Sequence, residues 1–173
     1  MESSIAIDVA APPSLVFALA RDVRRWPDLL PHYVAVRPSG PVENGLLTAR
    51  MIARRPLVTV LGLGLPVAWR AMSWNEPDQL RLRFRHIGGA TRGMDVTWRI
   101  EPSEGGCRVT IEHRFSPRIA PWAGLVNRFF IRPIAARTLA TFKAIAEAVA
   151  TSEPETSKAR DESGATEPAY PVR

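Results

Sequence analysis

Apolar and polar residues alternate along most of the first 115 positions of the chain. Ile5, Ile7 and Val9 form the first alternating run, and the two prolines that follow end it because proline cannot donate a hydrogen bond to a strand ladder. Six further runs follow, separated by turn residues such as Gly105 and Gly106. The pattern predicts seven β-strands: Ser4–Ala10, Tyr33–Arg37, Leu46–Arg54, Val67–Trp74, Leu80–His86, Met94–Ile100 and Cys107–Phe115.

Helical spacing is found in two places. After the first strand, Leu15 and Leu19 lie on one side of a short helix that Ser14 can cap, and the stretch "RRWPDLLP" predicts a second short helix. A longer apolar pattern covers residues 121–150, where Pro133 is predicted to kink the helix. An antiparallel sheet with one apolar face buries that face best by wrapping around this helix. We therefore expect an α+β fold with a cavity between sheet and helix.

The end of the chain has a different composition. Residues 151–173 are rich in Ser, Thr, Glu and Pro and show no apolar periodicity. Such a segment buries too little apolar surface to offset the conformational entropy lost on ordering. We expect one domain over residues 1–150, followed by a disordered tail over residues 151–173.

The net charge of the chain is +6, and nearly all of the positive charge is arginine, since Lys143 and Lys158 are the only lysines. A basic chain can bind nucleic acid or an acidic membrane surface. The arginines are spread over most segments and alternate with apolar residues, instead of forming a stripe with interleaved aromatic residues. We expect them to solvate outer faces, with no nucleic-acid partner. A protein-interaction module that uses this basic surface stays an alternative.

The cysteine count and the hydropathy pattern bear on location. Cys107 is the only cysteine, so the fold does not depend on an internal disulfide and suits a reducing compartment. The chain start lacks a basic segment followed by an apolar run, and no later stretch reaches the ~20 apolar residues that a membrane-spanning helix needs. We expect a cytoplasmic protein without a membrane span. The pattern carries no signal for an oligomeric state.

Four stretches carry a resemblance to a known superfamily: "APPSLVFALARDVRRWPDLLPHY", "GGATRGMDVTWRIEP", "EGGCRVTIEHRF" and "RTLATFKAIAEAV". Together they resemble the START-like or Bet v 1-like (SRPBCC) superfamily over about residues 3–149, in particular its polyketide cyclase/dehydrase and coenzyme Q-binding group. The resemblance implies a helix-grip fold, with seven antiparallel strands around a long C-terminal helix and two short helices after the first strand. It also implies a deep apolar cavity with Trp26 and Tyr33 at its entrance.

One position departs from the pattern of this group. Aromatase/cyclases that resemble the chain have an arginine about four residues after a tryptophan on a middle strand, placed to polarise a polyketide carbonyl. Here Ser73 follows Trp69 at that spacing, and Arg70 lies on the opposite strand face. The resemblance therefore supplies the fold but no catalytic arginine.

Strand parity selects the side chains that face the cavity. It turns His86 and His113 inward, at one level on either side of Met94. Neutral imidazoles can exchange protons with a bound ligand, which makes both histidines catalytic candidates; the alternative is that they bond backbone or water at the cavity rim. No third ligand has an evident position, so no metal is expected. The expected cavity residues are Trp26, Tyr33, Trp69, Phe84, His86, Met94, Trp98, His113, Trp122 and Phe130.

Two functions remain open at this point. The first is binding of a hydrophobic small molecule, such as a lipid, a quinone or a polyketide, in the cavity. The second is a cyclase, aromatase or dehydratase that acts on a bound polyketide chain. An apolar cavity with histidines at its rim suits carriage, whereas several polar donors converging at its base suit catalysis. No nucleotide-binding fingerprint or Ser-His-Asp arrangement stands out, so no cofactor is expected.

Overall fold

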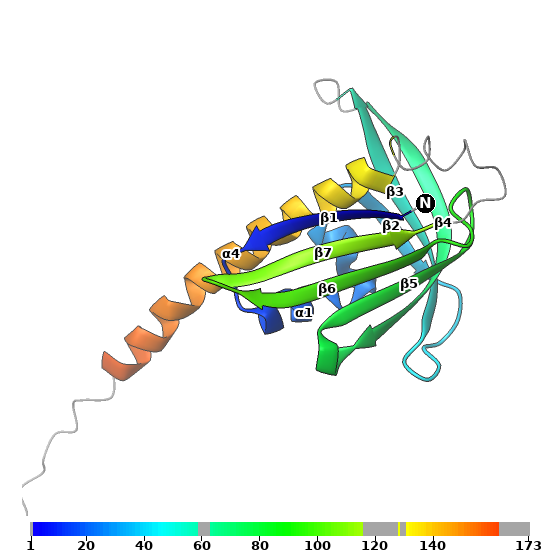
Figure 1. Cartoon of the computed structure of the whole chain (residues 1–173). Helices are drawn as coiled ribbons and strands as arrows, with labels where there is room; N and C mark the ends of the chain where they lie inside the picture. Colours follow the sequence, from blue (N-terminus) through cyan, green and yellow to red (C-terminus); the bar gives the residue numbers. More distant parts are fainter. Residues whose placement is uncertain (1, 59–62, 116–127, 129–130, 163–173) are drawn as a thin grey trace, which may run out of the picture.

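The computed structural model describes residues 2–58, 63–115, 128 and 131–162. Its seven strands form one antiparallel sheet in the order β1-β7-β6-β5-β4-β3-β2, which curves around a long C-terminal helix (Figure 1). This is the α+β helix-grip architecture expected from the sequence. The strands are β1 (Glu2–Val9), β2 (Tyr33–Pro38), β3 (Leu47–Val58), β4 (Leu63–Glu76), β5 (Arg81–Gly88), β6 (Asp95–Ser103) and β7 (Gly106–Arg114). The helices are α1 (Pro13–Ala20), η1 (Val23–Arg25), α2 (Trp26–Leu29), η2 (Pro77–Gln79) and α4 (Arg132–Glu162).

The first strand and the last helix are joined by side-chain bonds. From β2 to β7 each strand pairs with the next one along the chain, whereas β1 pairs with β7. The Glu147 carboxylate on α4 accepts a hydrogen bond from the Ala10 backbone N–H at 2.8 Å. Lys143 donates to the Asp8 carbonyl at 2.7 Å and pairs with Glu147 at 2.6 Å. These bonds fix the end of β1 against the middle of α4.

The inner face of the sheet carries the core. Alternate residues of β5, β6 and β7 are buried, as strand parity predicted, because one face of each strand is covered by the helices and the other meets water. Phe142 and Leu139 of α4 pack into the same core. The buried residues of the three strands include Leu82, Phe84, His86, Val96, Trp98, Ile100, Val109, Ile111 and His113.

One local prediction about a helix end was wrong. Pro12, not Ser14, stands at the N-cap of α1, and no side chain caps this helix. The fixed φ of proline suits the start of a helix, where its missing N–H leaves no bond unmade. Pro133 is the second residue of α4, and residues 128 and 131 just before this helix have π-helical geometry, so the predicted kink at Pro133 stays a prediction. Residues 121–127, which were predicted as helix, lie outside the described residues.

The helix α4 continues past the predicted domain end at Ala150 and reaches Glu162. The Thr151 and Ser152 hydroxyls bond to the carbonyls of Glu147 and Ala148, one turn earlier, so these polar residues are satisfied within the helix. The helix thus runs past the predicted domain end, and the division into a domain over residues 1–150 and a tail stays a prediction. The last residues, 163–173, lie outside the described part of the chain.

The end of α4 beyond Ala150 is expected to add little to stability. A chain that ends at Ala150 should melt within about 2 °C of the full chain, because residues 151–162 show no apolar periodicity with which to pack against the core. A chain that ends at Thr141 is the control: it loses the buried Phe142 and Ala146 and should not fold. Thermal unfolding followed by circular dichroism compares the three chains. A loss of more than about 5 °C on removal of residues 151–173 contradicts the prediction.

Candidate functional site

A cavity of about 90 Å³ lies between the inner face of the sheet and the first turns of α4. Its walls come from β3 to β7, the start of β2, the β5–β6 turn and α4. Eight of the ten residues predicted for the cavity line it: Trp26, Tyr33, Trp69, Phe84, His86, Met94, Trp98 and His113. The other two, Trp122 and Phe130, lie outside the described residues. Most of the remaining wall is apolar, with Met51, Ile111 and Ile134 among its side chains.

His86 is held on two sides. Its Nδ1 atom lies 2.7 Å from the Thr91 hydroxyl, within hydrogen-bond distance. The indole of Trp69 on β4 stacks on the imidazole, with ring centroids 5.8 Å apart and an interplanar angle of 16°. Because Nδ1 is occupied by Thr91, the Nε2 atom is the ring nitrogen left for a ligand.

The turn that carries Thr91 depends on a glycine. Gly89 has φ +89°, which side chains rarely adopt, and a Cβ atom there would lie 2.8 Å from the Ala68 carbonyl oxygen. The β5–β6 turn therefore packs directly against the backbone of β4 beside Trp69. This close approach brings the Thr91 hydroxyl back to His86, a contact that the sequence pattern did not indicate.

His113 lines the same cavity, but it is not level with His86 as the simple register predicted. His113 pairs with Val96 on β6, whereas the backbone of His86 bonds to the carbonyl of Met94, two residues earlier on that strand. The offset arises in the β6–β7 hairpin, whose turn pairs Ser103 with Gly106 and thereby places His113 opposite Val96 instead of Met94. The two imidazoles are thus staggered by one inward-facing position.

Both cavity histidines are neutral at pH 7. Burial lowers the pKa of His86 to about 3, and the nearby His113 contributes in the same direction. Burial also lowers the pKa of His113 to about 4, which a hydrogen bond with the Ser3 backbone opposes. A neutral imidazole offers one donor and one acceptor, so these side chains suit carbonyl and hydroxyl groups.

A second polar group lies where β2 meets α4. The Thr138 hydroxyl donates to the Ile134 carbonyl at 2.8 Å, so it must accept the hydrogen bond from His32 Nε2, also at 2.8 Å. This assigns the proton of His32 to Nε2, and its buried Nδ1 has no partner among the described residues. Burial lowers the pKa of His32 to about 4, and Arg137 adds to this effect. Burial raises the pKa of Tyr33, although a hydrogen bond with Thr138 opposes the rise.

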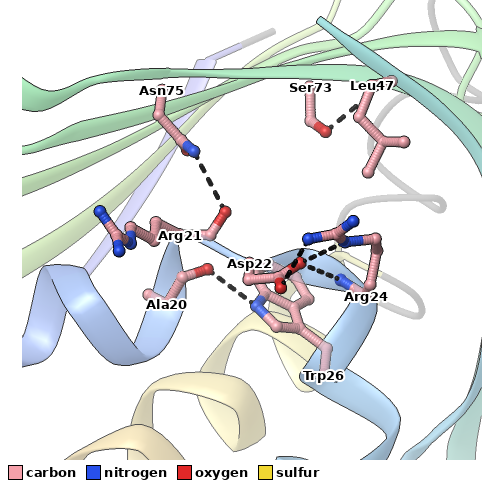
Figure 2. A network of polar contacts seen from close by, with 8 residues as sticks. All are labelled: Ala20, Arg21, Asp22, Arg24, Trp26, Leu47, Ser73 and Asn75. Carbon is pink, nitrogen blue, oxygen red and sulfur yellow. Dashed lines mark hydrogen bonds and ion pairs between the residues drawn. The ribbon is translucent and has the colours of Figure 1, made fainter. Parts of the chain in front are cut away.

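Trp26 is a core residue, not a residue of the entrance. It is 2% exposed, and its indole N–H donates to the Ala20 carbonyl at 2.9 Å (Figure 2). Its ring centroid lies between 5.2 and 5.9 Å from four other aromatic rings, those of Tyr33, Phe84, Trp98 and Phe142. The expected role of Trp26 and Tyr33 as an entrance gate is therefore corrected: both are buried, and both form the cavity wall.

The turn before Trp26 is shaped by a local ion pair. The Asp22 carboxylate accepts hydrogen bonds from the Arg24 backbone N–H at 3.2 Å and from its guanidinium at 2.8 Å (Figure 2). Arg24 holds the pKa of Asp22 below its usual value, an effect that burial opposes. Asn75 of β4 donates to the Arg21 carbonyl at 3.2 Å and ties the same turn to the sheet. These contacts direct the indole of Trp26 into the core.

No arginine lines the cavity within the described part of the chain. Ser73, which stands at the spacing of the family arginine, donates a hydrogen bond of 3.4 Å to the Leu47 carbonyl (Figure 2). Arg70 lies on the exposed face, as parity predicted. Across residues 2–58, 63–115, 128 and 131–162, no cluster of His, Cys, Asp and Glu has the geometry of a metal site. No helix among these residues is long and apolar enough to cross a membrane.

The fold recurs in several solved structures. Zhui aromatase/cyclase from Streptomyces sp. R1128 is 16% identical, with a TM-score of 0.70 over 85% of this chain and 93% of that one. TTHA0849 from Thermus thermophilus is 20% identical, with a TM-score of 0.66 over 86% of this chain and 99% of that one. The di-domain ARO/CYC StfQ from the steffimycin biosynthetic pathway is 16% identical, with a TM-score of 0.70 over 87% of this chain and 52% of its own. At these identities the likeness shows the fold alone.

The sequence itself matches a family. No curated protein sequence matches the chain. The profile of the family described as "Polyketide cyclase / dehydrase and lipid transport" matches residues 1–150, which contain every residue of the cavity described above. The family and the similar folds indicate a hydrophobic ligand-binding fold of the polyketide cyclase/dehydrase type. The chain therefore belongs to the polyketide cyclase/dehydrase and lipid transport family.

Proposed function

We propose that the protein binds an uncharged hydrophobic small molecule, such as a lipid, a quinone or a polyketide, whose carbonyl or hydroxyl group bonds to His86 or His113. The observation that carries the proposal is the burial of two neutral imidazoles in one otherwise apolar cavity. One ring nitrogen of each imidazole is already bonded, to Thr91 in His86 and to the Ser3 backbone in His113, and a ligand oxygen would bond to the second one. An uncharged oxygen fits better than a carboxylate, because no cation among the described residues lines the cavity.

The size of the cavity limits what enters it. Small-molecule sites usually have volumes of ~300–1,000 Å³, several times the 90 Å³ present here. One ring or a short chain fits this space, and a longer molecule fits only if the side chains of the wall move. A ligand with a compact polar head therefore suits the cavity better than a long folded chain.

The proton affinity of the histidines favours carriage over catalysis. General acid–base groups work best with a pKa near the operating pH. With pKa values of about 3 and about 4, His86 and His113 hold a proton at pH 7 in roughly one molecule per thousand or fewer. Such groups are good hydrogen-bonding partners but poor general acids. The cyclase, aromatase or dehydratase alternative rests on the family and on the two histidines facing one cavity.

Ligand binding is testable through the tryptophans of the wall. Trp26, Trp69 and Trp98 line the cavity, so a benzoquinone with a decyl tail should quench their fluorescence when it binds. His86→Phe and His113→Phe should each weaken this binding about 3- to 10-fold, because each substitution removes one hydrogen bond to the ligand. Titrations of the wild type and both variants give the dissociation constants.

The control is Cys107→Ala, since Cys107 is fully buried but does not line the cavity. Its dissociation constant should match that of the wild type. Binding that is equally tight in both histidine variants contradicts the proposed contacts, and a lack of saturable quenching contradicts the quinone as a ligand. The catalytic alternative predicts something different: turnover of a poly-β-ketone substrate that falls ~100-fold in either variant while binding changes little.

A further inference from the structure

Three arginines form one row across the outer face of strands β2, β3 and β4, which lie at the end of the sheet away from β1 (Figure 1). Arg37 pairs with Arg50 in the register of β2 and β3, and Arg50 pairs with Arg70 in the register of β3 and β4. All three side chains are exposed. Since neighbouring strands are about 4.8 Å apart, this arginine row spans only about 10 Å. Like charges that lie directly opposite each other destabilise a sheet, so the row lowers the stability of the folded protein.

Most other arginines of the outer face are neutralised. Strands β5, β6 and β7 contain six arginines, and five of them pair with carboxylates at distances from 2.9 to 3.8 Å: Arg83, Arg85, Arg99, Arg108 and Arg114. The sixth, Arg81, lies opposite Glu76 in the sheet register. On this part of the sheet each arginine thus has a carboxylate beside it or opposite it.

The arginine row has no such partner. No carboxylate of the described side chains forms an ion pair with Arg37, Arg50 or Arg70. Strands β2 and β3 contain no acidic residue, and Glu76, the only one in β4, already pairs with Arg83 at 3.4 Å. Residues 59–62 and 116–130 contain no Asp or Glu either. Among the described residues, three adjacent cations are thus held together without an anion, an arrangement that an external anion stabilises.

An apolar row lies beside the arginine row. Two positions further along each strand, and so on the same face, Ala35, Ile52 and Ala68 are again paired with one another. Ile52 is half-buried, and Val34 at the β2 bulge is 46% exposed. Arg54, on the far side of the apolar row, is exposed and also forms no ion pair with a described carboxylate. The surface is therefore a narrow apolar row flanked by cations.

We propose that this surface of β2, β3 and β4 docks an acidic amphipathic α-helix of a partner protein. The carboxylates of the helix pair with the arginine row and with Arg54, and its apolar stripe covers Ile52. Arginine suits this role because its planar guanidinium donates two parallel hydrogen bonds to one carboxylate. The surface lies on the outer face of the sheet, whereas the cavity lies on the inner face, so the proposal goes beyond ligand binding and does not depend on it.

The spacing of the arginine row matches a helix better than an extended peptide. Cβ atoms of residues i and i+4 on one helix face are about 5–6 Å apart, close to the strand spacing of about 4.8 Å. A helix that lies across the strands therefore places successive carboxylates over Arg37, Arg50 and Arg70. In an extended peptide the side chains of one face are about 6.8 Å apart, so its carboxylates fall out of step with the row. Nucleic acid matches the cations but leaves the apolar row without an apolar contact.

Fluorescence anisotropy with the full chain tests the proposal. The probe is a labelled, hydrocarbon-stapled helix of about 18 residues that carries leucines in one stripe and glutamates at i, i+4 and i+8 beside it. The wild type should bind this helix saturably. Arg50→Gln should weaken the binding about 3- to 10-fold, because Arg50 is the centre of the row, and Arg37→Gln or Arg70→Gln should weaken it less. Ile52→Ala should weaken it about threefold, because apolar contact area is lost.

Matched controls remove the same charge where the arginine already has a partner. Arg108→Gln and Arg114→Gln each take one cation from the outer face and should stay within about twofold of the wild type. A stapled helix of the same composition, with leucines and glutamates in scrambled positions, should bind about tenfold more weakly or worse. The urea midpoint of Arg50→Gln should stay constant or rise, because the substitution relieves repulsion within the row.

Three results overturn the proposal. The first is an absence of saturable binding of the acidic helix to the wild type. The second is equal weakening by Arg50→Gln and Arg108→Gln, because net charge alone then accounts for the binding. The third is a single-stranded DNA oligonucleotide that binds more tightly than the helix with the same dependence on Arg50, because nucleic acid is then the occupant of the surface.

Discussion

Acidification from about pH 7 to about pH 4.5 is expected to destabilise the folded protein by several kcal/mol, because three buried histidines can take up protons only after unfolding. His32 and His113 have a pKa of about 4 in the folded protein, and His86 has a pKa of about 3. In the unfolded chain each has the ordinary value near 6.5. The unfolded state therefore binds more protons throughout the interval between these values.

The sign and size of the effect follow from this difference. The contribution of the histidines to the free energy of unfolding is fully present above about pH 6.5 and is lost as the pH falls. The loss reaches up to ~1.4 kcal/mol per pH unit for each histidine, and so ~4 kcal/mol per pH unit for the three together. The charged groups that act on these imidazoles work in the same direction, Arg137 on His32 and His113 on His86. Asp22 and Glu147, whose pKa values are lowered by ion pairs, also lose stabilisation in acid, but both are partly open to solvent, which screens these pairs, and add little.

Urea unfolding between about pH 7 and about pH 4.5 measures this loss. Each of the variants His32→Gln, His86→Gln and His113→Gln should reduce the slope of unfolding free energy against pH by about a third, whatever its effect on stability at pH 7. Glu147→Gln, which removes a half-buried carboxylate outside the histidine sites, is the control and should leave the slope nearly unchanged. A stability that is flat over this interval shows that the histidines are not buried as neutral groups.

Trp26→Ala is expected to lower the free energy of unfolding by about 3–5 kcal/mol, the range for loss of a large buried aromatic side chain. The substitution removes contacts with four aromatic rings and the hydrogen bond to Ala20. Trp98→Ala should have an effect in the same range, because Trp98 is buried between Trp26 and Phe142.

Denaturant midpoints of these variants at pH 7 check the prediction. Val34→Ala, at an exposed position of β2, is the control and should change stability by less than about 0.5 kcal/mol. A gate residue would behave in the opposite way to a core residue: ligand association and dissociation rates would change while the midpoint stayed constant. An unchanged midpoint for Trp26→Ala would therefore restore the entrance role.

The elements that the sequence predicted best are those with one covered face. In β5, β6 and β7 the alternation of burial follows directly from the alternation of residue types, so Phe84, Val96 and Ile111 could be placed inside from parity alone. Eight cavity residues were found in this way or through the family resemblance. Parity needs no knowledge of distant contacts, which is why it works from a single sequence.

The features that the sequence missed depend on contacts across the fold. Strands β3 and β4 were predicted too short, because residues 55–58 and 63–66 lack the period-two signal by which a strand is recognised. His32 stands in a turn by local criteria, and its burial comes from Thr138, which is 106 positions away. The stagger of His86 and His113 depends on the register that the Glu104–Gly105 turn gives to β6 and β7, and residue types alone do not specify this register.

The pairing of β1 with β7 has a consequence for how the chain reaches its folded state. The strands from β2 to β7 can pair with neighbours as each becomes available, whereas β1 must wait for a partner that lies about a hundred residues later, as the Asp8–Arg108 ion pair illustrates. Closing so long a loop is entropically costly, and contacts of high sequence separation form slowly. During synthesis the earliest strand is thus the last to find its place, and its apolar face depends on the arrival of β7 and α4 for cover.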